Sequence, residues 1–154
     1  DPTAMLALLV DEEKKIIYIY DEVYQKGLLN SEIADLIKAR GWARQRIIAD
    51  SAEQKSIADL RSLGVPNIQP VKKGKGSIMA GIQKVNEYQI IVDPSCKFTI
   101  AELGQYVYKK DKATGLYLNQ PVDANNHLMD CLRYAMGQPQ NKIIKGLSKG
   151  IFGF

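Results

Sequence analysis

The sequence predicts an α/β protein in which helices flank a mixed β-sheet. Two β-rich runs at the start of the chain are separated by a short charged turn, and strand-like and helix-like segments then alternate. The 154 residues, 45% of them hydrophobic, suffice for one domain with a buried core. This pattern predicts parallel strands joined by helices, next to an antiparallel hairpin.

The first three elements are predicted as strand, strand and helix. Residues Thr3–Val10 and Ile16–Tyr24 read as the two strands of a hairpin, joined by the charged residues 11–15. Apolar residues then recur at helical spacing from Ser31 to Arg40, and Gly41 ends that helix.

The middle of the chain alternates between short strands and helices. Ile47–Ala49 is apolar enough for a buried strand, and Ser51-Ala52-Glu53-Gln54 has a capping-box pattern that opens a helix ending at Gly64. Three more elements are predicted in the order strand, helix, strand: Ile68–Val71, Ser77–Tyr88 and Gln89–Val92.

The last third of the chain is predicted to contain two helices and a small hairpin. A second capping box, Thr99 to Glu102, opens one helix, and Thr114-Gly115 makes the turn of the hairpin. Asp123 or Ala124 starts the final helix, with Asp123 as its N-cap. We expect a domain over residues 1–138 and a loosely held C-terminal tail over 139–154.

Composition limits the classes of protein that fit. The net charge of +4 and the pI near 9.0 suit a polyanionic partner. Cys96 and Cys131 lie far apart, which indicates neither a disulfide framework nor a zinc site, so we expect a reducing, intracellular setting. No apolar run approaches the roughly 18 residues of a membrane span.

Two carboxylates are the candidates for chemistry. Asp50 follows a predicted buried strand. On the last predicted helix, His127 precedes Asp130 by about one turn, so His127 and Asp130 can share a helix face with Tyr134. Two such carboxylates can hold Mg²⁺ or Mn²⁺ over a phosphodiester. The alternative is that Asp50 caps the next helix and Asp130 is solvated or paired with Arg133, which is the more common role for isolated carboxylates.

Two lysine-rich segments are candidates for binding DNA phosphates. Lys72, Lys73 and Lys75 alternate with glycines before a predicted helix N-terminus, and Lys109 and Lys110 lie near the second hairpin turn. A solvated loop without a ligand is the alternative for both.

Several blocks of sequence, in order, resemble one family. Residues 49–57, beginning Ala-Asp-Ser-Ala-Glu-Gln, and residues 121–135, containing Asn-Asn-His-Leu-Met-Asp-Cys-Leu-Arg-Tyr, closely resemble the C-terminal nuclease domain of tailed-bacteriophage terminase large subunits. The resemblance covers nearly the whole chain. It implies a ribonuclease-H-like fold and an endonuclease that cuts concatemeric double-stranded viral DNA at the initiation and termination of packaging.

The resemblance also implies site residues, a cofactor and partners. Asp50 and Asp130 match the family's second and third catalytic aspartates and would bind Mg²⁺ or Mn²⁺, while His127 matches the histidine that accompanies the third. The implied partners are double-stranded DNA, an N-terminal ATPase domain, the portal and the small terminase subunit, with no membrane. The implied location is the host cytoplasm during phage assembly. No P-loop occurs in this sequence, so the ATPase would lie outside it.

The chain departs from the family pattern at its start. The family's first catalytic aspartate lies on a central strand just before an Asp-Pro-Thr sequence, and this chain begins with Asp1-Pro2-Thr3. We therefore expect the first strand to be missing, either supplied by a longer natural chain, which we favour, or replaced by a segment such as Ile151–Phe154. Two alternatives remain for function: another ribonuclease-H-like nuclease, or a non-catalytic module that docks on DNA or on the portal.

Overall fold

A computed structural model describes residues 2–105, 108–121, 126–137 and 147–153 of the chain. The elements follow the predicted order, with one additional strand after the last helix. They are β1 (Thr3–Asp11), β2 (Ile16–Gln25), α1 (Asn30–Ala39), β3 (Ile47–Ala49), α2 (Gln54–Ser62), β4 (Ile68–Pro70), α3 (Ser77–Asn86), β5 (Gln89–Val92), α4 (Lys97–Gln105), β6 (Tyr108–Lys110), β7 (Tyr117–Pro121), α5 (His127–Met136) and β8 (Leu147–Gly153).

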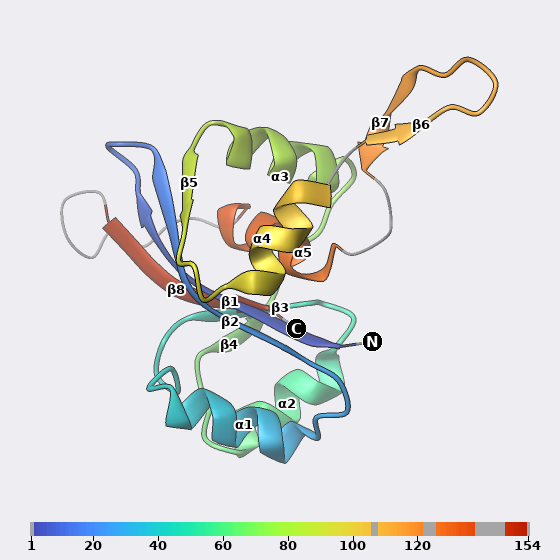
Figure 1. Ribbon diagram of the computed structural model, residues 1–154. Helices are drawn as coiled ribbons and strands as arrows, with labels where there is room; N and C mark the ends of the chain where they lie inside the picture. The colour runs from blue at the N-terminus through green and yellow to red at the C-terminus, as the bar shows by residue number, and fades with distance from the viewer. Residues whose placement is uncertain (1, 106–107, 122–125, 138–146, 154) are drawn as a thin grey trace.

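Six of the strands form one mixed sheet in the order β4-β3-β8-β1-β2-β5. β1 and β2 are the predicted antiparallel hairpin, whereas β2 with β5 and β3 with β4 are parallel pairs. Helices α1 and α2 cover one face of the sheet, and α3, α4 and α5 cover the other (Figure 1). The predicted α/β class, a mixed sheet flanked by helices, is confirmed.

The segment predicted as a loose tail contributes a central strand, so that part of the prediction is wrong. β8 pairs antiparallel with β1 and parallel with β3, with Gly153 opposite Met5 and Phe152 opposite Ile48. Without β8, the facing edges of β1 and β3 would leave buried backbone donors and acceptors without partners, which is costly. The central position expected to be vacant is therefore filled by Leu147–Gly153, which includes most of the segment named as the alternative.

The period of two in β1 divides its side chains between two cores. Met5 and Ala7 join the apolar cluster beneath α1 and α2. Ala4, Leu6 and Leu8 join the cluster beneath α3, α4 and α5. One strand thus anchors both helix layers to the sheet, which explains why β1 is buried almost throughout.

Both predicted capping boxes are wrong. Glu53 is the N-cap of α2 and makes no side-chain capping bond, and α4 begins at Lys97, so that Thr99 and Glu102 lie inside it. Thr99 and Glu102 form hydrogen bonds with β2 and α5, and a four-residue sequence pattern carries no information about such distant partners.

The second predicted hairpin is present. β6 and β7 pair as an antiparallel hairpin that projects away from the rest of the molecule (Figure 1). Asp123, the predicted N-cap of the last helix, lies outside the described residues. No helix in the described part of the chain has the length and apolar character needed to cross a membrane.

Candidate active site

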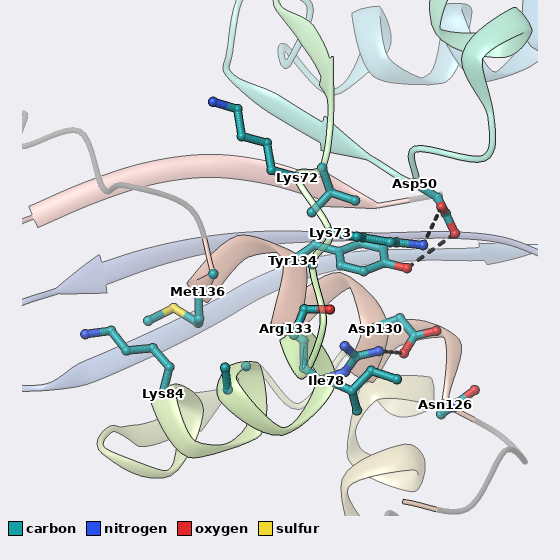
Figure 2. A pocket seen from close by; sticks show the side chains of 16 residues that line it. Asp50, Lys72, Lys73, Ile78, Lys84, Asn126, Asp130, Arg133, Tyr134 and Met136 are labelled. Atoms are coloured by element: carbon teal, nitrogen blue, oxygen red, sulfur yellow. Dashed lines mark hydrogen bonds and ion pairs between the residues drawn. The ribbon is translucent and has the colours of Figure 1, made fainter. Parts of the chain in front are cut away.

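An open cleft of about 930 Å³ lies where the ends of β3 and β4 meet α3 and α5. It is lined by acidic, basic and aromatic side chains, including Asp50, Lys73, Asp130, Arg133 and Tyr134. The carboxylates of Asp50 and Asp130 lie at the same end of the cleft, and Lys84 lies toward the opposite end (Figure 2). The fold therefore brings together the two aspartates that the sequence singled out.

Asp50 follows β3 directly and holds the turn into α2. Its Oδ1 accepts hydrogen bonds from the amide of Ala52 at 3.0 Å and from Nζ of Lys73 at 2.8 Å. Its Oδ2 accepts a 3.3 Å hydrogen bond from the hydroxyl of Tyr134 on α5. The alternative that Asp50 caps the next helix is wrong, because the N-cap of α2 is Glu53 and Asp50 bonds Ala52 in the turn before that helix.

The surroundings of Asp50 favour its charged form. Partial burial raises its pKa, but the hydrogen bonds from Ala52, Lys73 and Tyr134, with the charge of Lys73, outweigh burial and lower the pKa overall. The pKa of Lys73 is lowered by burial and raised more strongly by Asp50 and Tyr134, so it ends above its ordinary value. Lys73 and Asp50 therefore form an ion pair, with Lys73 Nζ also 5.2 Å from the centre of the Tyr134 ring.

Asp130, in the first turn of α5, pairs with Arg133 one turn later. This is the pairing named as an alternative for Asp130, and it occurs inside the cleft. Arg133 packs against α3 at Gly81, where an added Cβ would lie 3.2 Å from Cβ of Arg133. The Nε of Arg133 is buried and has no hydrogen-bond partner. The guanidinium thus pairs with Asp130 through one terminal nitrogen, and its Nε makes no hydrogen bond.

His127 is not among the residues that line the cleft. It is the first residue of α5, and its ring lies against Tyr24, with 6.0 Å between ring centres and 56° between ring planes. Asp130 and Tyr134 share the cleft face as expected, but His127 turns toward β2.

The predicted basic residues divide between those in the cleft and those outside it. Lys72 and Lys73 line it. Lys75 is exposed in the same loop and does not. The side chains of Lys109 and Lys110 lie outside the described part of the structure. Lys84 of α3 also lines the cleft and was missed, because a single lysine on an amphipathic helix carries no local signal.

The donors available to a metal ion are the two aspartates. Carboxylate oxygens are the hard ligands that Mg²⁺ and Mn²⁺ take in proteins, so the donor set fits such an ion. Within the ranges that the structure describes, no cluster of three or more His, Cys, Asp or Glu side chains is arranged to hold a metal. The fit thus rests on a pair of carboxylates, each now neutralised by a cationic neighbour.

Comparison with known proteins gives a family and close structural relatives. A family model described as "Terminase RNAseH like domain" matches residues 1–138. The chain is 32% identical over 145 residues to the terminase large subunit of Bacillus phage SPP1, covering 92% of this chain and 34% of that protein. It is 32% identical over 134 residues to the PBSX phage terminase large subunit of Bacillus subtilis strain 168, covering 86% and 30%. The chain thus spans about a third of these relatives.

A solved structure shares the fold. The crystal structure of the large-terminase nuclease domain of bacteriophage SPP1 with bound Mn matches with a TM-score of 0.82 and 32% identity, covering 88% of this chain and 77% of that chain. The expected ribonuclease-H-like fold is confirmed by these matches.

Proposed function

Because this chain belongs to the terminase RNase H-like domain family, the nuclease domain of terminase large subunits, we propose that it is a metal-dependent endonuclease. Its substrate is concatemeric double-stranded DNA, which it cuts at the initiation and termination of packaging. The observation that carries the proposal is the cleft in which Asp50 and Asp130, from separate elements, lie at one end beside cationic side chains.

Asp50 and Asp130 are the residues that would hold Mg²⁺ or Mn²⁺, and a related nuclease domain is known with bound Mn. Such an ion supplies Lewis-acid polarisation of a phosphate oxygen and a water molecule of lowered pKa. Hydrogen bonds hold Asp50 in its ionised form, which is the form that binds a cation, and an ion bound at Oδ1 would displace Lys73.

The cationic residues of the cleft are suited to the DNA backbone. Lys72, Lys73 and Arg133 line it, and their positive charges suit phosphate oxygens. Contacts with phosphates recognise the DNA backbone and do not distinguish the bases. They therefore fit a nuclease that cuts with little sequence preference. Lys75, Lys109 and Lys110 remain predicted contacts with the DNA backbone. His127 remains a predicted assistant that orients a ligand or handles a proton from the start of α5.

The proposed partners are those of a packaging motor. We expect an N-terminal ATPase domain in the same protein, and the portal and the small terminase subunit as further partners. The expected location is the host cytoplasm during phage assembly.

One observation favours the alternative of a non-catalytic module that docks on DNA or on the portal. β8 lies between β1 and β3, where the family pattern has the strand of the first catalytic aspartate, and Leu147–Gly153 contains neither Asp nor Glu. A third carboxylate therefore does not come from this strand.

Nicking of supercoiled plasmid separates the two candidates. We expect the chain to nick plasmid with Mn²⁺ or Mg²⁺ and not with EDTA, and Asp130→Asn to abolish nicking. Asp35→Asn, on the exposed face of α1, is the matched control and should cut normally. Intact plasmid with folded wild-type protein that still binds DNA would favour the docking module.

A further inference from the structure

We propose that Glu102 of α4 is a positioning residue of the site, which holds the first turn of α5 and thereby fixes where Asp130 lies. The effect on cutting rests on the proposed nuclease function. The anchoring of α5 does not, because it follows from contacts between α4 and α5.

Glu102 makes two bonds to the backbone of α5. Its Oε1 accepts the amide of Leu128 at 2.8 Å and that of Met129 at 3.1 Å. The first amides of a helix have no partner within the helix, and the helix dipole favours a negative charge there. The Glu102 side chain is only 5% exposed, so water does not compete well for these amides. One buried carboxylate therefore satisfies both donors.

Asp130 follows this anchored pair directly. Its own amide donates to the carbonyl of Asn126 at 2.9 Å, which closes the first turn of α5. Apolar packing of α5 against the sheet permits small shifts along the helix axis, since it is not directional. The two hydrogen bonds from consecutive amides to Glu102 restrict such shifts, because their lengths are fixed. The axial position of the Asp130 carboxylate therefore depends on Glu102.

Glu102 is itself fixed by a second carboxylate of the same kind. Glu22 on β2 accepts the amides of Phe98 at 3.0 Å and Thr99 at 2.8 Å, and the hydroxyl of Thr99 at 2.6 Å. Thr99 is fully buried. The sheet thus holds the start of α4 through Glu22, and α4 holds the start of α5 through Glu102. This relay connects β2 to the turn that carries Asp130.

Glu102 can accept the two amide hydrogen bonds whether it is protonated or ionised. Its pKa is raised to about 7, chiefly by burial; the bonds from Met129 and Leu128 lower the pKa, and the charges of Asp130 and Glu22 raise it. A carboxylic acid keeps a carbonyl oxygen that accepts an amide hydrogen bond, as does the side-chain amide of glutamine. Glu102→Gln should therefore preserve the anchor, while Glu102→Leu keeps similar bulk and removes the acceptor.

The experiment compares these two variants in three measurements. Amide hydrogen exchange at Leu128 and Met129 reports the anchor, calorimetric titration with Mn²⁺ reports the site, and plasmid cleavage gives kcat and KM. We expect Glu102→Leu to speed exchange at both amides, weaken Mn²⁺ binding and lower kcat by about 10- to 100-fold with KM for DNA little changed. Glu102→Gln should resemble wild type in all three.

Controls separate anchoring from general loss of structure. Exchange at Ile37 of α1, on the other side of the sheet, should stay slow in both variants. If Glu102→Leu does not fold, Glu102→Asp replaces it, because the shorter side chain keeps the charge but cannot reach both amides.

Two results would overturn the proposal. Unchanged exchange and cutting in folded Glu102→Leu would show that α5 needs no anchor. Loss of Mn²⁺ binding in Glu102→Gln as severe as in Glu102→Leu would make Glu102 a metal ligand. If wild type neither binds Mn²⁺ nor cuts while Glu102→Leu exchanges fast, the proposed function fails and the anchor stands.

Discussion

The two helix layers of this molecule are built differently. Beneath α1 and α2 the described core consists of apolar side chains such as Ile37, Leu60 and Ile68. Beneath α3, α4 and α5 the core is also apolar, but the two buried polar residues of the described chain, Thr99 and Glu102, both belong to α4. Helix α4 lies in that layer (Figure 1). The cleft opens on that side as well. The comparison indicates that one layer mainly stabilises the sheet, while the other also positions polar groups.

The largest expected effect comes from the polar layer. Asp50→Asn should lower plasmid cleavage by about 1,000-fold or more, because metal-held charge stabilisation amounts to several kcal/mol. The fold should persist, since the asparagine can still accept the bond from Ala52. Measurement of kcat with Mn²⁺, beside a circular dichroism spectrum, checks this. Asp59→Asn in α2 is the control, and equal losses in both variants would remove the distinction between the layers.

The apolar layer should respond in stability instead. Leu60 is fully buried, so Leu60→Ala should lower the free energy of unfolding by about 2–5 kcal/mol through lost burial and a cavity. Cleavage by the folded fraction should be unchanged. Urea denaturation measures the loss, and Leu63→Ala in the C-cap of the same helix, where the side chain is 37% exposed, should cost much less. A reduced kcat for folded Leu60→Ala would show coupling across the sheet.

Glu102 should make the stability of the polar layer depend on pH between about 4.5 and 7. Folding raises its pKa from an ordinary 4.5 to about 7, so the folded chain binds this proton more tightly than the unfolded chain. Its contribution to stability is then full below about pH 4.5 and is lost as the pH rises toward 7, with a slope of at most about 1.4 kcal/mol per pH unit.

Urea denaturation of wild type and Glu102→Gln between pH 4.5 and pH 7 isolates this proton. The wild-type stability should fall relative to the variant as the pH rises. Parallel curves for the two proteins would mean that Glu102 titrates alike in the folded and unfolded chains.

The smallest expected effect concerns DNA affinity. Lys72→Ala removes a cation that lines the cleft, so binding should weaken uniformly across sequences and the salt slope of log K should fall by about 1. Lys55→Ala, exposed on α2, should leave both unchanged. Fluorescence anisotropy at several salt concentrations makes the comparison, and equal slopes would indicate that DNA does not enter the cleft.

Local pattern was sufficient for most of the fold. The β1–β2 hairpin and the strand before Asp50 are found as expected, because alternation and apolar runs are signals contained within a few residues. The expectation of a terminase nuclease domain came from ordered blocks of sequence, and the family match confirms it. The residues alone left open whether Asp50 and Asp130 would meet in one cleft, since 80 residues of sequence separate them, and the resemblance favoured that they would.

What the sequence did not reveal depends on distant partners. Thr99 and Glu102 fit a local capping box, yet α4 begins at Lys97, so both lie inside the helix and bond Glu22 and α5 instead. The Gly-rich residues of β8 look like a tail in isolation, and only the open edges of β1 and β3 give them a role. Lys84 reaches the cleft because of how α3 packs on α5.

The place of β8 also has a consequence for how the chain acquires its fold. Every other described element precedes β8 in sequence, yet β8 joins the pair β3–β4 to the group β1–β2–β5. During synthesis the two parts of the sheet cannot be bridged until residues 147–153 leave the ribosome. Pairings of such high sequence separation are also the slow ones to form. We therefore expect the exposed edges of β1 and β3 to be the surfaces that a nascent chain must protect from aggregation.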